Sequence, residues 1–152
     1  MSVQTSYELR TGKAYAGGLY DLNPADIVTG IVESASIEFG AGVQRGTNDR
    51  QILAGGGGAA NLFGISIRSV DREINKATGE TKYLDEESAG VLRDGYVWVT
   101  CIDGCTPGAT VFVNDTDGTF RATTSAGFTQ ATNCEFQSTA AAGELAVLKI
   151  SN

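Results

Sequence analysis

The side chains that could perform chemistry in this sequence are carboxylates and thiols, because the chain contains no histidine. Histidine is the side chain most used for proton transfer near neutral pH, so its absence excludes Ser-His-Asp and Cys-His mechanisms. Two acidic runs, Asp85-Glu86-Glu87 and Asp115 with Asp117, remain as candidates for a carboxylate pair of the glycosidase type. Both runs stand beside turn-forming residues, so we interpret them as solvated turns. We expect no catalytic residues and therefore no enzyme.

The thiols are the second candidate group. The sequence contains three cysteines, Cys101, Cys105 and Cys134, which are too few for a zinc site of the usual tetrahedral Cys/His type. Cys101 and Cys105 flank a predicted turn, where a strained disulfide is one possibility. We favour the interpretation that all three are small, buried, hydrophobic side chains.

Two short motifs resemble ligand-binding loops. Asp115-Thr116-Asp117-Gly118 is similar to the start of a calcium loop, but Val113 stands where the EF-hand pattern needs an acid or an amide. Gly55–Gly58 could be offered as a phosphate cradle, but no Lys-Ser/Thr and no helix follow it. We therefore expect no metal and no other cofactor. We predict that this glycine run is a hinge or a disordered loop.

The charge of the chain limits its partners. The formal net charge is −7, from 18 acidic and 11 basic residues, and the basic residues are scattered along the sequence. Binding to nucleic-acid phosphates needs clustered Lys and Arg, so we expect no nucleic-acid partner. Met1–Arg10 lacks the basic start and apolar core of a signal peptide, and no apolar run approaches the roughly 18 residues of a membrane span. We expect no membrane partner.

The pattern that must position these side chains is that of an all-β fold. Twenty glycines and only two prolines punctuate short apolar runs, and no window keeps a helical period for long. In Ile37–Val43 the apolar residues Ile37, Phe39, Ala41 and Val43 fall on every second position, which places them on one face of a strand. Glycines stand between them, so the other face is bare backbone that another element or another chain can approach closely.

The strongest strand prediction is Gly90–Cys101. Its residues Val97, Val99 and Cys101 share one face, while Tyr96 and Trp98 share the other. A polar hairpin is predicted near 70–84, and further strands at Leu62–Arg68, Ala109–Val113, Thr119–Ala122, Asn133–Gln137 and Leu145–Ser151. Roughly eight strands at this spacing predict a small antiparallel β-barrel or a sandwich.

The N-terminal part of the chain differs from the rest. Met1–Asp21 holds three tyrosines and few aliphatic residues, so it cannot form a core of its own. Asn23–Val28 fits either a single helical turn, with Asn as its N-cap, or an extended segment stiffened by proline. We favour the extended segment. We therefore divide the chain into an extended N-terminal arm over 1–36 and one barrel-like domain over 37–152.

Several stretches, taken in order, resemble the head decoration, or cement, proteins of tailed bacteriophages. They are Gly17-Gly18 with Asp21, Ile37–Val43 leading to Gly46-Thr47, Phe63-Gly64-Ile65, Gly90-Val91 with Gly95–Val99, Pro107–Val113, and Ala146–Ile150. The resemblance covers most of the chain from about residue 17 onward. Gly42 is a departure, because these proteins usually carry Ala at that place.

The resemblance implies a small β-barrel or β-tulip-like domain that forms homotrimers on the outer surface of the phage head. There it would bridge neighbouring subunits of the major capsid protein at local threefold positions and stabilise the mature lattice. Such a protein is made in the host cytoplasm and becomes part of the virion. We expect the capsid or subunit interface to include Tyr15, Tyr20, Ile27 and Val28 of the arm and the strand face around Phe39.

Two other functions compete with this one. A receptor- or glycan-binding module on the virion surface would show an exposed aromatic ring beside carboxylates. A tail-tube or connector subunit would form rings and not trimers.

Overall fold

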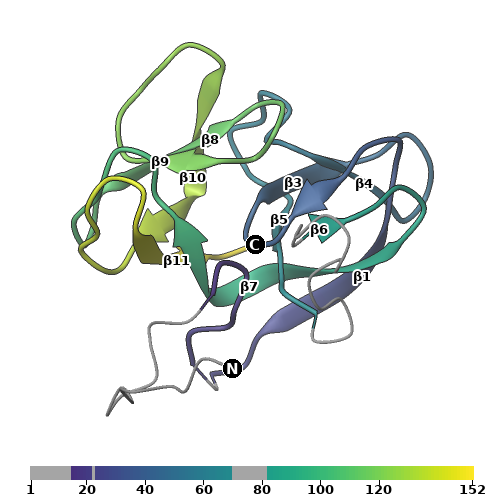
Figure 1. The fold of residues 1–152 in the computed structure, drawn as a ribbon, viewed down its shortest axis with the longest axis horizontal. Helices are drawn as coiled ribbons and strands as arrows, with labels where there is room; N and C mark the ends of the chain where they lie inside the picture. Colours follow the sequence, from purple (N-terminus) through teal and green to yellow (C-terminus); the bar gives the residue numbers. More distant parts are fainter. Residues whose placement is uncertain (1–14, 22, 70–81) are drawn as a thin grey trace, which may run out of the picture.

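The structure is a computed structural model, and it describes residues 15–21, 23–69 and 82–152 (Figure 1). These residues form strands, turns and loops and contain no helix. They therefore include no helix long and apolar enough to cross a bilayer. The strands are β1 (Asp26–Val32), β2 (Ile37–Glu38), β3 (Gly42–Arg45), β4 (Gln51–Ala54), β5 (Gly64–Ser66), β6 (Lys82–Tyr83), β7 (Ser88–Thr100), β8 (Thr110–Asn114), β9 (Phe120–Arg121), β10 (Phe128–Phe136) and β11 (Leu145–Ile150). The all-β prediction is confirmed.

Five of these strands close into a barrel. The order β1-β4-β3-β5-β7 is completed by a pairing of β7 with β1, so no edge is left open within the ring. The pairing of β1 with β4 is parallel and the other pairings in the ring are antiparallel. The predicted barrel is therefore present, with one parallel contact that the prediction of an antiparallel barrel does not include.

A second sheet continues from the barrel through one shared strand. β7 is 13 residues long, and beyond its barrel half it pairs with β11, which leads on to β10, β8 and β9. The two halves meet at Gly95, whose φ of 140° suits a residue without a side chain. Figure 1 shows β8–β11 on one side of the molecule, the barrel strands on the other, and β7 running between them.

Each half has its own hydrophobic core. The barrel core contains Val32, Ile37, Phe39, Ala41, Val43, Ile52, Tyr83, Ala89 and Val91. The second core lies between the other sheet and the outer face of β5 and β7, and its largest side chains include Phe120, Phe136, Leu92, Leu148 and Ile150. Burying a side chain of this size contributes roughly 1.5 to 3 kcal/mol, so these two clusters supply the main force for folding.

The predicted strand over Ile37–Val43 is interrupted. All four alternating residues are buried, as predicted, but Gly40 has a φ of 75° and turns the chain between β2 and β3. The bare backbone is also contacted, because the amide of Gly42 donates to the carbonyl of Gly118 at 2.8 Å. A Cβ on Gly42 would lie 2.8 Å from a methyl of Val113. The close neighbour is therefore the β8–β9 hairpin of the same chain, which leaves little space for a side chain at residue 42.

The glycine run Gly55–Gly58 is an ordered part of the fold, so its prediction as a hinge or disordered loop is wrong. The amide of Gly55 donates to the carbonyl of Gly42 at 2.9 Å, and the amide of Gly56 donates to Asn114 at 2.9 Å. A Cβ on Gly55 would lie 2.3 Å from a backbone oxygen of the β8–β9 turn. The missing side chains therefore allow two backbone segments to pack against each other.

The N-terminal region contributes to the sheet earlier than predicted. Residues 26–32, placed in the arm by the sequence, form β1 and pair with both β7 and β4. The reason is that Val28, Gly30 and Val32 alternate toward the barrel interior. This alternation is hard to recognise in the sequence, because the segment is short and follows a proline. The segment after Pro24 is extended and not helical, as we favoured. Of the predicted hairpin near 70–84, residues 70–81 lie outside the described residues, and Lys82–Tyr83 pairs with β2.

Candidate functional site

The segment 15–21, which we call the arm segment, is bound to one edge of β7 through its backbone. The amide of Gly17 donates to the carbonyl of Trp98 at 2.7 Å, and the amide of Trp98 donates to Gly18 at 2.9 Å. The amide of Tyr20 donates to Tyr96 at 3.1 Å. Glycine is required at position 17 for this fit. Its φ is 79°, and a Cβ there would lie 2.8 Å from the backbone nitrogen of Arg68. The arm segment thus extends the sheet at the edge of β7, and Tyr96 and Trp98 on the second face of that strand are half-buried.

The side chains of the arm segment are displayed outward. Tyr15 is 69% exposed and Tyr20 is 51% exposed. The Arg68 guanidinium lies 4.1 Å from the centroid of the Tyr15 ring, and the Tyr20 ring meets Trp98 edge to face at 5.5 Å. Each ring is therefore held at its base by a neighbour while its outer surface stays open, which is the arrangement of an interface anchor.

Strand β1, which pairs with the barrel half of β7, also carries exposed apolar side chains. Ile27 is 42% exposed and Ile31 is 36% exposed, because alternation turns them outward while their neighbours face the barrel. Leu19 of the arm segment is also exposed. We call the five side chains Tyr15, Leu19, Tyr20, Ile27 and Ile31 the arm–β1 surface.

The two other residues predicted for the interface pack into the core. Val28 is partly buried against the barrel core. Phe39 is buried, and its ring meets Tyr83 edge to face at 5.1 Å between centroids. The structure therefore gives both side chains a packing role, and it adds Leu19 and Ile31 in the same neighbourhood. The outward position of Ile31 could be predicted from the alternation in β1 if that strand were recognised in the sequence.

The acidic runs and the cysteines occupy structural positions. Asp85 accepts a hydrogen bond from the amide of Ser34 at 2.6 Å, and Asp117 accepts one from the amide of Thr119 at 2.9 Å. Both carboxylates therefore hold turns, as interpreted from the sequence. No group of three or more His, Cys, Asp or Glu in the described part of the chain is placed to hold a metal ion.

All three cysteines are free and buried, which confirms the favoured interpretation. Burial raises the pKa of the Cys101 thiol to about 12, and it raises the pKa of Cys134 to about 12 as well. Burial also raises the pKa of Cys105. These thiols are protonated at neutral pH and poor nucleophiles.

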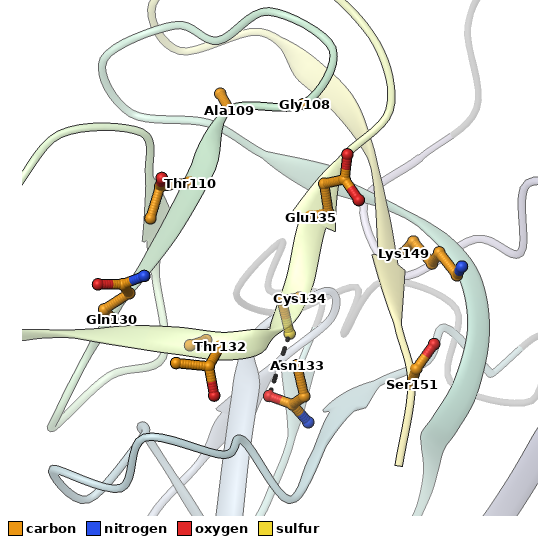
Figure 2. Close-up of a pocket in the computed structure, with 11 residues that line it drawn as sticks. Gly108, Ala109, Thr110, Gln130, Thr132, Asn133, Cys134, Glu135, Lys149 and Ser151 are labelled. Atoms are coloured by element: carbon orange, nitrogen blue, oxygen red, sulfur yellow. Dashed lines mark hydrogen bonds between the residues drawn. The ribbon is translucent and has the colours of Figure 1, made fainter.

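A cleft of about 340 Å³ lies beside β10, where that strand loses register with β8 between Gln130 and Glu135 (Figure 2). Glu135 and Lys149 stand opposite each other on β10 and β11. The side chain of Asn133 forms two hydrogen bonds of 2.9 Å with the backbone of Leu62. Its oxygen accepts from the Leu62 amide and its NH₂ group donates to the Leu62 carbonyl. None of the described residues lining the cleft is aromatic, so these residues provide no ring on which a sugar could stack.

Comparison with known proteins decides the family. Residues 3–151 match the family model described as structural cement protein (E217 gp24/Pam3 gp6). The chain belongs to this phage structural cement protein family. A solved structure titled "The capsid of Myoviridae Phage XM1" contains a chain with a similar fold, at 18% sequence identity and a TM-score of 0.73. The match covers 100% of this chain and 99% of the other. A search of curated proteins finds no match.

The resemblance expected from the sequence is thus confirmed. The cement protein is a component of the phage particle that associates with the capsid and stabilises it. The residues at its contacts with the capsid are the subject of the proposal below.

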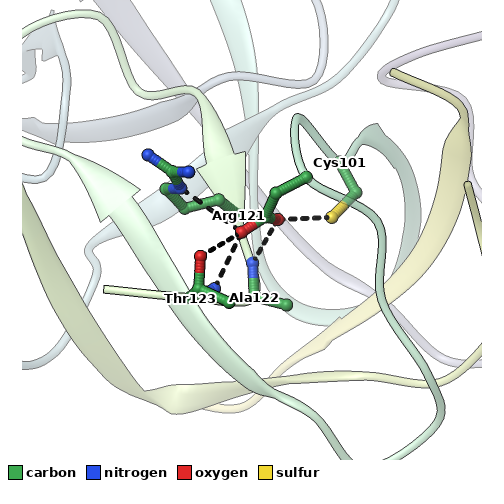
Figure 3. A network of polar contacts seen from close by, with 5 residues as sticks. Cys101, Arg121, Ala122 and Thr123 are labelled. Atoms are coloured by element: carbon green, nitrogen blue, oxygen red, sulfur yellow. Dashed lines mark hydrogen bonds and ion pairs between the residues drawn. The ribbon is translucent and has the colours of Figure 1, made fainter. Parts of the chain in front are cut away.

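One residue of the cement protein that sequence reasoning does not single out, Asp103, lies in the predicted turn between Cys101 and Cys105. The Asp103 carboxylate accepts hydrogen bonds from the amide of Ala122 at 2.8 Å, from the amide of Thr123 at 3.0 Å and from the Thr123 hydroxyl at 2.5 Å (Figure 3). Arg121 forms an ion pair with it at 3.4 Å. Burial alone would raise the pKa of Asp103, but the hydrogen bonds from Thr123 and Ala122 outweigh it and hold this pKa well below its usual range. Asp103 therefore fastens the chain after β9 to the end of β7.

Proposed function

We propose that this cement protein binds the outer surface of the mature phage head at local threefold positions, as a homotrimer, and bridges neighbouring subunits of the major capsid protein. The observation that carries the proposal is the arm segment. Its backbone is bound to β7, while Tyr15, Leu19 and Tyr20 face outward. Large aromatic side chains that are already ordered lose little conformational entropy on binding, so they are suited to anchor an interface.

The mechanism that we propose is energetic and involves no reaction. A protein that binds the mature lattice and not its precursor stabilises the mature lattice by mass action. Weak contacts repeated over a shell also add, because each bound copy holds neighbouring subunits at high effective concentration. The net charge of −7 keeps a protein made in many copies in the host cytoplasm soluble before it assembles.

The arm–β1 surface is tested by replacing Tyr15 and Tyr20 together with serine. We expect the variant to fold and to lose co-sedimentation with heads that lack the cement protein, because two anchor rings typically contribute about 2 kcal/mol or more each. Ile102→Ser is the matched control, since Ile102 is 43% exposed, lies beyond the end of β7, and is hydrogen-bonded through its amide to Phe120 and not to the arm segment. Equal binding by the double variant and the control would remove the arm–β1 surface from the proposal.

The homotrimer is tested separately by light scattering. We expect a particle of three times the 15.8 kDa of one chain. A larger ring would instead favour a tail-tube or connector subunit. Binding of the purified protein to a glycan array, without binding to heads, would favour a receptor-binding module.

A further inference from the structure

A pocket that contains two arginines forms on the barrel wall, and its lining glycines Gly56 and Gly57 are hydrogen-bonded to the backbone of Asn114 and Asp115. It has a volume of about 390 Å³, and Arg45, Phe63 and Arg93 are among its lining residues. These three come from three neighbouring strands or their flanks, because Arg45 ends β3, Phe63 precedes β5 and Arg93 lies in β7. The described lining residues include no Asp or Glu. The charged side chains that line the pocket are thus both arginines, in a chain whose net charge is −7.

The two arginines flank one aromatic ring. The Arg45 guanidinium carbon lies 4.5 Å from the centroid of Phe63, and that of Arg93 lies 5.2 Å from it. Among the described residues neither arginine forms an ion pair with a carboxylate. Two cations near one ring repel each other unless an anion lies between or beside them, so the arrangement favours binding of a negative group.

Arg93 supplies a donor that the fold leaves unused. Its Nε is buried and has no hydrogen-bond partner. Among the described residues it is the only buried side-chain nitrogen or oxygen without one. A buried N–H without a partner is costly in a folded protein and calls for a ligand or a water. The Nε edge of a guanidinium, together with one Nη, is also the edge that binds a carboxylate in bidentate fashion.

The wall around this donor is rigid. The side-chain amide of Asn152 donates to the carbonyl of Phe63 at 3.2 Å and to that of Arg93 at 3.0 Å. Asn133 clamps the preceding residue, Leu62, with two hydrogen bonds. The ring and the guanidinium are thus held in place before any partner arrives, which lowers the entropic cost of binding.

A second groove adjoins the pocket and extends its charge. It has a volume of about 210 Å³, shares Arg45 and Phe63 with the pocket and adds Arg50, beside a single acid, Asp49. A partner that crosses the barrel wall would therefore meet two guanidinium groups beside the Phe63 ring and a third arginine in the adjoining groove. The apolar face of Phe63 suits the methylene stem of an acidic side chain, whereas the net negative charge of the chain opposes the approach of a polyanion such as nucleic acid.

We propose that this pocket binds the carboxylate of a Glu or Asp side chain from a neighbouring protein in the particle, with Arg93 as its bidentate donor and Arg45 as a second cation. The proposal rests on the capsid-binding function given above. It adds a charge-specific contact to the apolar contact of the arm–β1 surface.

The first test is independent of the phage head. The Nε–H resonance of Arg93 is followed by ¹⁵N NMR in the full chain while a glutamate-rich peptide is added, with the glutamine version of the peptide as the control. We expect a saturable shift with the glutamate peptide alone, and loss of that binding in Arg45→Gln. An unmoved resonance, or the same response to both peptides, would overturn the proposal. Tighter binding of a single-stranded oligonucleotide or of inorganic phosphate would overturn the choice of a carboxylate.

The second test uses heads that lack the cement protein. Arg93→Lys keeps the charge but removes the guanidinium edge, and we expect it to weaken binding about tenfold or more, because a lysine ammonium cannot form the bidentate contact. Lys149→Arg, on β11, is the control for exchange of one cationic side chain for the other away from the pocket. Equal binding by wild type and Arg93→Lys would refute this contact and leave the capsid-binding function standing. If the wild type itself does not bind, the capsid-binding function fails, and the NMR experiment still decides whether the pocket takes a carboxylate. Melting temperatures of all variants confirm that each is folded.

Discussion

Replacement of Asp103 by asparagine should destabilise the cement protein without moving its backbone. Asparagine keeps one acceptor oxygen but places an NH₂ group where the carboxylate faces the amides of Ala122 and Thr123. At least one hydrogen bond to a charged acceptor is lost, and a donor then faces a donor. Hydrogen bonds to charged groups contribute about 1.5 to 3 kcal/mol each, so we expect the free energy of unfolding to fall by about 2 to 3 kcal/mol.

The same substitution should change the response of stability to acid. The folded-state pKa of Asp103 is lowered, so its contribution is complete above the unfolded value of about 3.9 and is lost as the pH falls below that value toward the folded pKa. The wild type should therefore lose stability faster than Asp103→Asn below about pH 4, and the two should converge.

Urea unfolding followed by tryptophan fluorescence, at pH 7 and at several values between pH 3 and pH 5, measures both effects. Glu144→Gln is the control, because Glu144 is an exposed carboxylate at a loop. A difference of less than about 0.5 kcal/mol between wild type and Asp103→Asn at pH 7, or parallel pH profiles, would refute the role assigned to this carboxylate.

Three further predictions concern close packing. Gly42→Ala should cost about 1 to 3 kcal/mol in urea unfolding, since its Cβ would lie 2.8 Å from a methyl of Val113, and Val113→Ala in the same chain should recover part of that loss. Gly17→Ala should release the arm segment, because a Cβ there would meet backbone at 2.8 Å, and limited proteolysis should then cleave within it faster than in the wild type. Cys101 and Cys134, with pKa values raised to about 12, should react with a thiol reagent at pH 8 only after unfolding; rapid reaction in the native protein would contradict their burial.

The parts of the fold that could be predicted are those set by local alternation. Val97 and Val99 of β7, and Cys101 directly after it, are buried because a period of two places them against the second core. The four apolar residues of Ile37–Val43 are buried for the same reason. The family resemblance could also be recognised, because it depends on glycines and strands in order along the chain.

The parts that could not be predicted depend on contacts between distant segments. Gly40 turns the chain inside an alternating pattern that reads as one strand. Gly55–Gly58 has no side chains, and its order comes from hydrogen bonds to backbone that lies far along the sequence. The pocket around Phe63 joins residues from three strands, none of which stands out alone. Interface residues were predicted by type, so Phe39 was included although its ring is in the core.

β7 is the strand that both cores and the arm segment share. It forms part of the barrel with β1 and β5, pairs with β11 in the other sheet, and is hydrogen-bonded to the arm segment beyond the barrel. Tension applied to the arm segment would therefore reach β7 first. The barrel and the other sheet cannot move apart without breaking pairings of that one strand.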